Sequence, residues 1–347
     1  MVTTRPERAE STSYRQYLPA GFDPGNGSAK LLVDGTETRI PSLIQPLHTD
    51  IYDVPECKDG SLITYLSGDR SDLVGQRWFA GRNAYLYAPL GHQKVLEDSK
   101  GKIKFGLQLL LGALGTLPRR PEWKLGVILS IQDAKVFGDE LAESVAGRHT
   151  ISIGSNVSVS HVCIDVESVV DEGAGAIAHA ITSGSVAPNS QTIVLDFGHG
   201  TTIITPFGAK GKAINRRVIN AGVSDLIEAI AKNIDTRRQL HAEGDRQLIR
   251  EGIERGDFTY GTTDWNFRSV YNNELSPWVQ SVLSPSLKAC APWKATSEAI
   301  LAIGGGSMLP AISQLLTKQG ITTIGDGCWA NARGLEKLAQ LKLGRAK

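Results

Sequence analysis

The sequence has few cysteines and no long apolar segment. Its 4 cysteines are Cys57, Cys163, Cys290 and Cys328, which lie far apart and form no C-x-x-C pair. This spacing argues against a zinc ribbon or a disulfide framework, and it favours the reducing environment of the cytoplasm. No stretch approaches the roughly 18 apolar residues of a membrane span, and the charged N-terminus has no apolar signal region, so we expect neither feature.

The sequence also lacks an excess of charge of either sign. Lys and Arg number 37 against 36 Asp and Glu, which leaves a formal net charge of +1. Without a long basic run, the composition offers no electrostatic surface for direct nucleic-acid binding. Any contact with DNA would therefore be made through a partner protein.

Two widespread nucleotide-binding motifs are missing as well. The chain contains no G-x-x-x-x-G-K-[ST] run, and neither "GNGSAK" (residues 25–30) nor "GGGSML" (residues 304–309) has the G-x-G-x-x-G spacing. A nucleotide site in this chain would therefore be of neither the P-loop nor the Rossmann type.

What the chain does contain is a repeated acidic turn between apolar strands. "AGFDPGNGSAKLLV" (residues 20–33) carries Asp23, and "VLDFGHGTTIITPF" (residues 194–207) carries Asp196. An unpaired carboxylate at the end of a buried strand is costly, so each position needs a cation, a donor or a water-filled cleft. Glycines let a ligand approach the backbone, and successive turn amides bind phosphate. We therefore expect the turns to face one another and to share a hydrated Mg²⁺ that binds a triphosphate.

Side chains next to the two turns would add donors. Ser28 follows the first turn, Thr201 and Thr202 follow the second, and Lys30 would project from the next strand to neutralise phosphate charge. Each piece also has a purely structural interpretation. A single Asp-Gly hairpin is commonly only a turn, and an edge lysine is commonly solvated.

A third glycine cluster lies in "AILAIGGGSMLPAI", residues 299–312. It follows an apolar strand and precedes a helix that we expect to begin near Ser307. Because glycines 304–306 have no side chains, a flat ring can lie against their backbone. Ligand contact and tight packing are both open for this cluster.

Strand patterns precede helix patterns twice along the chain. Residues 20–80 predict a β-meander, residues 103–117 an amphipathic helix, and residues 171–184 a helix of small residues. The strand pattern restarts at Gln191, and a charged helical stretch is expected over residues 236–256. The length and this order predict two α/β lobes on related plans, with a cleft between them.

Taken in order, four segments resemble the actin, sugar-kinase and chaperone ATPase superfamily. They are "FDPGNGSAK", "DEGAGAIAHAI", "LDFGHGTT" and "AIGGGSMLP", which are similar to its first phosphate loop, connecting helix, second phosphate loop and adenosine loop. The segments "TRIPSLI", "WFAGRNA", "FGDELAESVAGRHTISI", "DFTYG" and "CWANARG" resemble bacterial actin-like proteins of the ParM plasmid-segregation type. The resemblance covers roughly residues 20–340, and the combination is far more specific than any one piece.

The resemblance implies an actin-like fold, with two duplicated, ribonuclease H-like α/β lobes flanking a nucleotide cleft. Residues 1–19 would be a flexible arm. The first domain would span residues 20–190 and the second residues 191–327, and a helix within 328–347 would return to the first domain.

Carried over by position, the resemblance also implies a site. Asp23 and Asp196 would position Mg²⁺ and the attacking water, and Glu172 would orient that water, with Glu167 as the alternative. For both glutamates, helix capping is the structural alternative. The nucleotide-binding residues would be Gly25, Asn26, Gly27, Ser28 and Lys30, then Gly198, His199, Gly200, Thr201 and Thr202, and finally Gly304, Gly305, Gly306, Ser307 and Met308. His199 departs from the family pattern, either as a solvent-facing loop residue or in contact with the γ-phosphate.

The implied function is a cytoplasmic, polymerising ATPase whose filaments form with ATP, or with GTP, and disassemble on hydrolysis. Its implied partners are further copies of itself and a small DNA-binding adaptor through which it would move plasmid DNA. A chromosomally encoded filament affecting cell shape is the alternative. A small-molecule kinase and a non-hydrolysing scaffold on the same fold also remain open.

Overall fold

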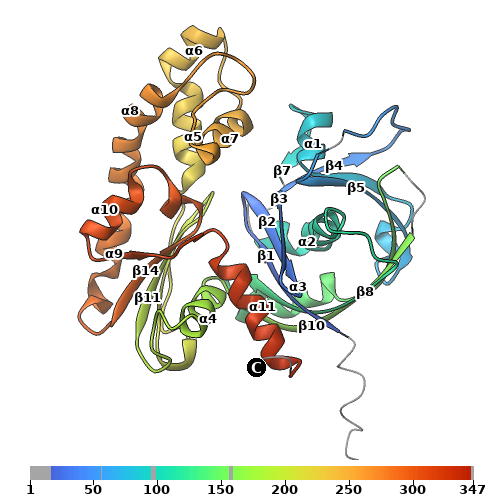
Figure 1. Cartoon of the computed structure of the whole chain (residues 1–347), viewed down its shortest axis with the longest axis horizontal. Coiled ribbons are helices and arrows are strands. Elements are labelled where there is room, and N and C mark those ends of the chain that lie inside the picture. Colours follow the sequence, from blue (N-terminus) through green and yellow to red (C-terminus); the bar gives the residue numbers. More distant parts are fainter. Residues whose placement is uncertain (1–16, 56, 95–98, 156–158, 345–347) are drawn as a thin grey trace, which may run out of the picture.

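The protein has two lobes, each built on its own β-sheet (Figure 1). The computed structural model describes residues 17–55, 57–94, 99–155 and 159–344, so nearly all of the expected N-terminal arm lies outside the described residues. Within them, the first sheet has 10 strands and the second has 5.

The first sheet has a mixed core and an antiparallel extension. The core order is β3 (Thr36–Pro41), β2 (Ser28–Val33), β1 (Leu18–Pro24), β8 (Glu122–Ile131) and β10 (Val159–Asp171). The strands β1 to β3 pair antiparallel, whereas β8 pairs parallel with both β1 and β10. The extension continues with β9 (Gly147–Ile153), β5 (Gly60–Gly68), β6 (Arg77–Gly81), β4 (Leu43–Leu47) and β7 (Gln93–Lys94).

The β-meander predicted over residues 20–80 is therefore correct only for β1 to β3. The next strand, β4, pairs with β6 and β7 at the far end of the sheet instead of with β3. Alternating hydrophobicity identifies a strand, but partner choice depends on contacts between segments distant in sequence.

The second sheet repeats the core of the first. Its order is β13 (Arg217–Ile219), β12 (Thr202–Phe207), β11 (Thr192–Phe197), β14 (Ala299–Ile303) and β15 (Thr322–Thr323). The strand β11 pairs antiparallel with β12 and parallel with β14, as β1 pairs with β2 and β8. Asp23 lies opposite Lys30 in its hairpin, and Asp196 lies opposite Ile203 in the second. The predicted α/β class and the duplication of the lobes are confirmed by this shared strand order and direction.

Helices cover the sheets where their apolar faces can be buried. The leucines of α2 (Ser99–Leu114) enter the core of the first lobe, and α5 (Val223–Lys232) and α8 (Arg268–Trp278) enter the core of the second. The other helices are α1 (Arg82–Tyr87), α3 (Ala134–Val145), α4 (Ala174–Thr182), α6 (Ile234–Leu240), α7 (Arg246–Arg255), α9 (Ser284–Lys294), α10 (Ile312–Lys318) and α11 (Ala330–Lys342). None of the helices in the described ranges is both long and apolar enough to cross a membrane.

Two helix predictions need correction. The stretch 236–256 is broken into two helices. The helix α6 is followed by His241, whose φ of 55° is left-handed. The helix α7 begins after Asp245, whose carboxylate accepts hydrogen bonds from amides in the first turn of α7. The helix expected near Ser307 is there only a short 3₁₀ helix over Gly305–Met308, and the α-helix α10 begins at Ile312. Leu309 precedes a proline, which disfavours the helical conformation, and it is extended (ψ 138°).

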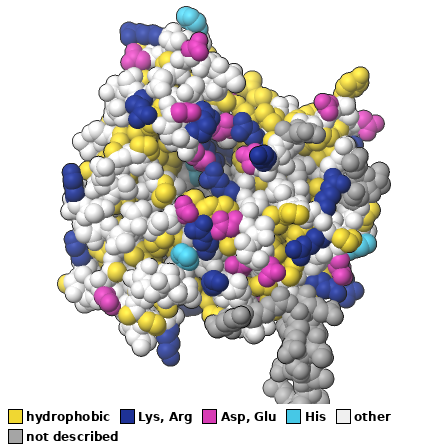
Figure 2. Space-filling model, viewed as in Figure 1, with side chains coloured by type: hydrophobic (Ala, Val, Ile, Leu, Met, Phe, Trp, Pro, Cys, Tyr) yellow, Lys and Arg dark blue, Asp and Glu magenta, His cyan; other side chains and the backbone are white. Residues whose placement is uncertain are grey.

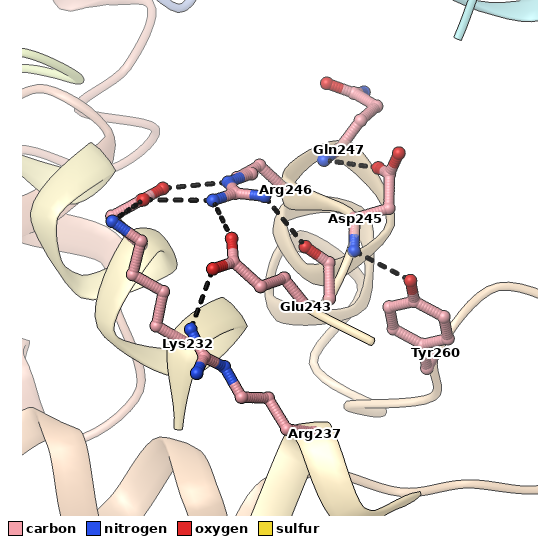
Figure 3. A network of polar contacts seen from close by, with 9 residues as sticks. Lys232, Arg237, Glu243, Asp245, Arg246, Gln247 and Tyr260 are labelled. Carbon is pink, nitrogen blue, oxygen red and sulfur yellow. Dashed lines mark hydrogen bonds and ion pairs between the residues drawn. The ribbon is translucent and has the colours of Figure 1, made fainter. Parts of the chain in front are cut away.

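The helices α5 to α7 are tied together by the polar network drawn in Figure 3. Arg246 on α7 donates to both carboxylate oxygens of Glu228 on α5, at 2.8 and 3.0 Å, and to Glu243 at 2.7 Å. Arg237 on α6 reaches the other oxygen of Glu243 at 2.8 Å. This network fixes the part of the second lobe that lies next to the first lobe.

The lobes are joined where α4 and α11 cross. Glycines 175 and 334 meet there, and a Cβ built on Gly334 would lie 1.6 Å from the carbonyl oxygen of Gly175. The helix α11 also lies against β1 and β8 of the first sheet, where Leu335 and Ala339 pack on Ile128. Only glycine allows the two helix backbones to approach this closely.

Candidate functional site

A cavity of about 400 Å³ lies between the two lobes, and both acidic turns line it. A Cβ built on Gly27 would lie 2.8 Å from the Cβ of His199, and one built on Gly200 would lie 3.1 Å from Nδ2 of Asn26. The tips of the two turns therefore touch. Figure 2 shows charged side chains of both signs gathered along the boundary between the lobes on this face.

Most of the residues expected at the site line this one cavity. They are Asp23, Gly25, Asn26, Gly27, Ser28, Lys30, Glu172, Asp196, Gly198, His199, Thr201, Gly304, Gly305 and Met308. Gly200, Thr202, Gly306 and Ser307 are not among the lining residues. The structure thus brings three glycine-rich segments together from distant parts of the chain.

Asp23 is surrounded by donors. Lys30 Nζ lies 3.0 Å from its Oδ2, and Ser130 and Asn331 each donate to its Oδ1 at 3.0 Å. Burial favours protonation of this carboxyl, but the charges of Lys30 and Lys102 outweigh it and hold the pKa of Asp23 below its usual value. The interpretation of Lys30 as a solvated edge lysine is wrong, because its side chain is only 12% exposed and paired with Asp23.

Asp196 occupies the equivalent place with opposite surroundings. Within the described part of the chain, no side chain donates a hydrogen bond to it. Burial, reinforced by the charges of Glu172 and Asp23, raises the pKa of Asp196 to about 7, although Lys30 and Lys102 oppose this shift. The two lysines do not offset the burial and the two carboxylates, so a further cation in the cavity would stabilise the ionised Asp196.

The second turn is held by the N-terminus of α5. The amides of Val223 and Ser224 donate to the carbonyls of Gly198 and His199, at 3.1 and 2.7 Å. The buried Thr202 hydroxyl donates to the carbonyl of Ala221 at 2.9 Å, so it supports the turn rather than facing the cavity.

His199 lies in the wall of the cavity against Gly27, so the solvent-facing alternative is wrong. Burial, together with the charges of Arg250 and Lys94, lowers the pKa of His199 to about 3. Its imidazole is therefore neutral at pH near 7.

The triple glycine packs tightly at two positions and borders the cavity, so tight packing is confirmed and ligand contact stays a prediction. A Cβ on Gly304 would lie 2.5 Å from Oδ1 of Asp196, and one on Gly306 would lie 2.7 Å from the Cβ of Phe197, so these two glycines allow tight packing. A Cβ on Gly305, in contrast, would meet nothing within 4 Å, and this residue lines the cavity. The buried Ser307 hydroxyl donates to the carbonyl of Gly304 at 2.8 Å and stabilises the loop.

The two candidate glutamates lie in different places. Glu172, between β10 and α4, lines the cavity, and its Oε1 accepts a hydrogen bond from Lys102 Nζ. The N-cap of α4 is Gly173, and it has no side-chain cap, so Glu172 does not cap this helix. Glu167 lies on β10 and is not a lining residue. Burial raises its pKa, and Lys342 donates to its backbone carbonyl at 2.6 Å.

Comparison with known proteins identifies the fold. Residues 21–175 match the family model described as the N-terminal domain of actin-like proteins. An archaeal actin homologue superposes with a TM-score of 0.70 at 17% identity, covering 93% of this chain and 99% of that one. The chain has an actin-like fold. No curated protein sequence matches it.

Two ParM structures are also similar to this actin-like chain. One is a 15-stranded ParM filament from Clostridium botulinum, with a TM-score of 0.67, 15% identity and coverage of 94% of this chain and 99% of that one. The other is ParM from Bacillus thuringiensis with ATP, with a TM-score of 0.66, 16% identity and the same 94% and 99% coverage. At these identities the likeness shows a shared fold, so the resemblance to actin-like proteins is confirmed for the fold.

Four side chains of the candidate site were not found from the sequence: Lys102, Ser130, Arg250 and Asn331. Lys102 offered a signal, because it shares a helix face with the buried residues Gly106, Leu109 and Leu110. A lysine on an apolar face requires a buried partner. Asn331 lies in the segment "CWANARG", to which no site role was given. Ser130 and Arg250 lie outside the quoted segments and reach the site only through tertiary contacts, such as the 2.5 Å hydrogen bond from Arg250 Nη1 to the carbonyl of Gly27.

The donor set fits a hydrated magnesium ion held partly by a ligand. Among the described residues, no group of three or more His, Cys, Asp or Glu side chains forms a metal cage. Mg²⁺ does not need one, because it keeps several waters and is bound by one or two carboxylates and substrate phosphates. Asp196, a carboxylate with no side-chain donor or ion-pair partner among the described residues, fits this role. The oxygens of Asp23 already accept from three donors, so Asp23 would act through the water shell.

Proposed function

We propose that this protein is a nucleotide-dependent, polymerising ATPase. The observation that carries the proposal is the convergence of two equivalent hairpins, with Asp23, Asp196 and Lys30, on one cavity that Gly305 also lines. The cavity volume of about 400 Å³ lies within the range of small-molecule sites. ATP is the preferred candidate because ATP is present in the similar ParM structure, and GTP is the alternative.

The lining divides into a polar and an apolar part. Lys30 and the two glycine turns would bind the phosphates, since turn amides and a lysine both favour anions. The apolar residues Val223, Ile227, Ile253, Met308, Leu309 and Pro310 would hold the base beside Gly305. Asp196, with Asp23 through water, would hold Mg²⁺, which would neutralise phosphate charge.

Glu172 would orient the attacking water. Its Oε1 is engaged by Lys102, and among the described residues its Oε2 has no hydrogen-bond partner. A carboxylate oxygen on the cavity wall is suited to accept a hydrogen bond from a water beside the terminal phosphate.

Polymerisation would use head-to-tail contacts between copies of the chain. Heterologous contacts that do not close into a ring generate filaments, and one of the similar ParM structures is itself a filament. The cellular task would be plasmid segregation through a small DNA-binding adaptor, which agrees with the net charge of +1. A filament affecting cell shape is the alternative.

The test is to measure phosphate release, pelleting and electron micrographs of the purified protein with and without nucleotide and Mg²⁺. The wild type should form filaments with nucleotide. Asp196→Asn should lower phosphate release by about 10²-fold, because it removes the carboxylate that balances the cation. Lys337→Gln, at an exposed position of α11, is the control. A wild type that stays monomeric and releases no phosphate over a concentration series would contradict the proposal.

The segregation role has its own test. Filaments should bind plasmid DNA only when a small DNA-binding protein encoded beside this chain is added. Direct binding of the purified filaments to DNA would contradict the adaptor, and a gene neighbourhood without such a protein would favour the cell-shape alternative.

A further inference from the structure

Lys102 is a buried lysine that the four loops do not explain. It lies in the first turns of α2 and is 4% exposed. Later residues on the same face of the helix, Gly106, Leu109, Leu110 and Ala113, are buried in the first lobe. The apolar face of α2 therefore packs in the core, and at the N-terminal end of that face the charged Lys102 lines the cavity.

The charge is used by one carboxylate. Lys102 Nζ donates to Oε1 of Glu172, and the two side chains are only 6% and 13% exposed. A buried ion pair is weak evidence for stability, because desolvation of both groups offsets their attraction. A leucine or methionine at this position would fill the same face of α2 without that cost. The presence of a lysine here is therefore better explained by its contact with Glu172.

The contact constrains Glu172 at one oxygen only. Glu172 precedes Gly173, whose φ of 87° is left-handed. The Glu172 side chain therefore extends from a turn and makes no capping hydrogen bond to α4 that would fix its orientation. Lys102 supplies the missing orientation by binding Oε1. Within the described residues Oε2 stays without a partner, on a residue that lines the cavity.

We propose that Lys102 is the positioning residue for hydrolysis, holding the Glu172 carboxylate with one oxygen directed to the attacking water. This inference rests on the proposed ATPase function. In that reaction the water oxygen forms a bond to the γ-phosphorus and the bond to the bridging oxygen breaks. The electron pair of the broken bond leaves with ADP, and the water proton passes to Glu172.

The charge of Lys102 also acts on the two aspartates of the cavity. It favours the ionised form of Asp23, whose pKa is lowered, and it opposes the rise in the pKa of Asp196 that burial and the two nearby carboxylates cause. Lys30 lies 3.0 Å from Asp23 and belongs to the first hairpin, whereas Lys102 comes from a different helix and contacts Glu172. Each lysine thus contacts a different carboxylate of the cavity.

The test compares Lys102→Met, Lys102→Arg, Glu172→Gln and the double variant Lys102→Met/Glu172→Gln. Nucleotide binding and phosphate release are measured on the same preparations, and Lys104→Met, at an exposed position of α2, is the control. Lys102→Met should bind nucleotide within a few-fold of wild type but release phosphate about 10²-fold more slowly, which is the usual effect of losing an oriented base. Lys102→Arg should restore part of the rate.

The double variant separates positioning from a structural role. If Lys102 acts through Glu172, the double variant should be no slower than Glu172→Gln alone, because residues acting as a unit are not additive. The double variant also removes the buried carboxylate that Lys102→Met leaves unpaired. The double variant can therefore be compared with Glu172→Gln even if Lys102→Met does not fold.

Three results would overturn the inference. The first is wild-type phosphate release by Lys102→Met, and the second is a loss in the double variant equal to the product of the single losses. In both of these cases the wild type still hydrolyses nucleotide and the proposed function stands. The third is a wild type that binds nucleotide without releasing phosphate, which would reject the ATPase function and this inference together.

Discussion

Asp23 and Asp196 occupy equivalent strand positions but differ in their hydrogen-bond donors. Asp23 accepts from Lys30, Ser130 and Asn331, which keeps it ionised. Asp196 has no such donors among the described residues, and its pKa rises to about 7 because of burial and two nearby carboxylates. The duplication of the hairpins places the two aspartates at equivalent positions. Their different surroundings give the two carboxyl groups opposite pKa shifts.

His149 gives a residue-scale prediction for the dependence of stability on pH. It is 1% exposed on β9, with Nδ1 2.8 Å from the Tyr65 hydroxyl and Nε2 3.3 Å from the carbonyl of Val145. Burial lowers the pKa of His149 below 6.5. Below that pH the unfolded chain takes up a proton that the folded chain does not, so the free energy of unfolding falls as the pH falls.

Urea unfolding at about pH 7.5 and about pH 5.5 checks this prediction, because the two values bracket the unperturbed histidine pKa. His149→Gln should be less stable than wild type at the higher pH but should lose less stability on acidification. His161→Gln, at an exposed position of the adjacent strand β10, should lose as much as wild type. Equal losses in all three proteins would show that His149 does not titrate in this way.

At the scale of elements, α5, α6 and α7 depend on charge as well as on apolar burial. The hydrogen bonds of Arg246 and then of Lys232 lower the pKa of Glu228 to about 2. The ionised carboxylate is therefore favoured in the folded state, and its contribution is lost as the pH falls below about 4.5 toward that value. The pair is more than a third exposed, so solvent screens much of its energy.

Arg246→Met should lower the free energy of unfolding by about 1 kcal/mol or less, since it removes contacts to two carboxylates that are both partly exposed. The difference from wild type should shrink in high salt. Arg238→Met is the matched control, because its pair with Asp235 is more exposed, at 73% and 58%. Chemical unfolding at low and high salt measures both variants, and a salt-independent loss would point to lost packing of the alkyl stem instead.

At the scale of the whole molecule, the lobes meet on the open side of the cavity as well as at the α4–α11 crossing. We define the inter-lobe bridge as the ion pairs Arg82–Glu251 (3.1 Å) and Arg39–Glu254 (2.6 Å) together with Leu248. Leu248 of α7 packs against a cluster in the first lobe that includes Leu43, Leu62, Phe79 and Tyr85. The bridge joins α7 of the second lobe to the first lobe beside the cavity, and we expect it to favour the closed arrangement.

Leu248→Ala should open this side of the cavity, because the apolar contact is lost and the partly exposed ion pairs contribute less. The radius of gyration from small-angle scattering should rise, and bound fluorescent nucleotide should dissociate several-fold faster. Leu315→Ala, at an exposed position of α10, should change neither quantity. An unchanged radius together with an unchanged dissociation rate would show that the α4–α11 crossing alone sets the closure.

Local patterns were sufficient for part of this architecture. The two acidic turns, the strand before the triple glycine and the leucine face of α2 could be predicted, because turn chemistry and apolar periodicity are properties of neighbouring residues. The same reasoning predicted one helix over residues 236–256 and continued the meander beyond β3. Both errors arose where a left-handed residue or a distant strand partner, rather than local preference, decided the structure.

The sequence by itself determined that two Asp-Gly hairpins recur on duplicated α/β units, because hairpins and amphipathic helices depend on contacts close in the chain. Only the tertiary structure decided that Lys102 meets Glu172, that Asn331 reaches Asp23 across 308 positions, and that the pKa of Asp196 is raised. Burial and charge pairing depend on which distant surfaces pack together, and no local pattern encodes that choice.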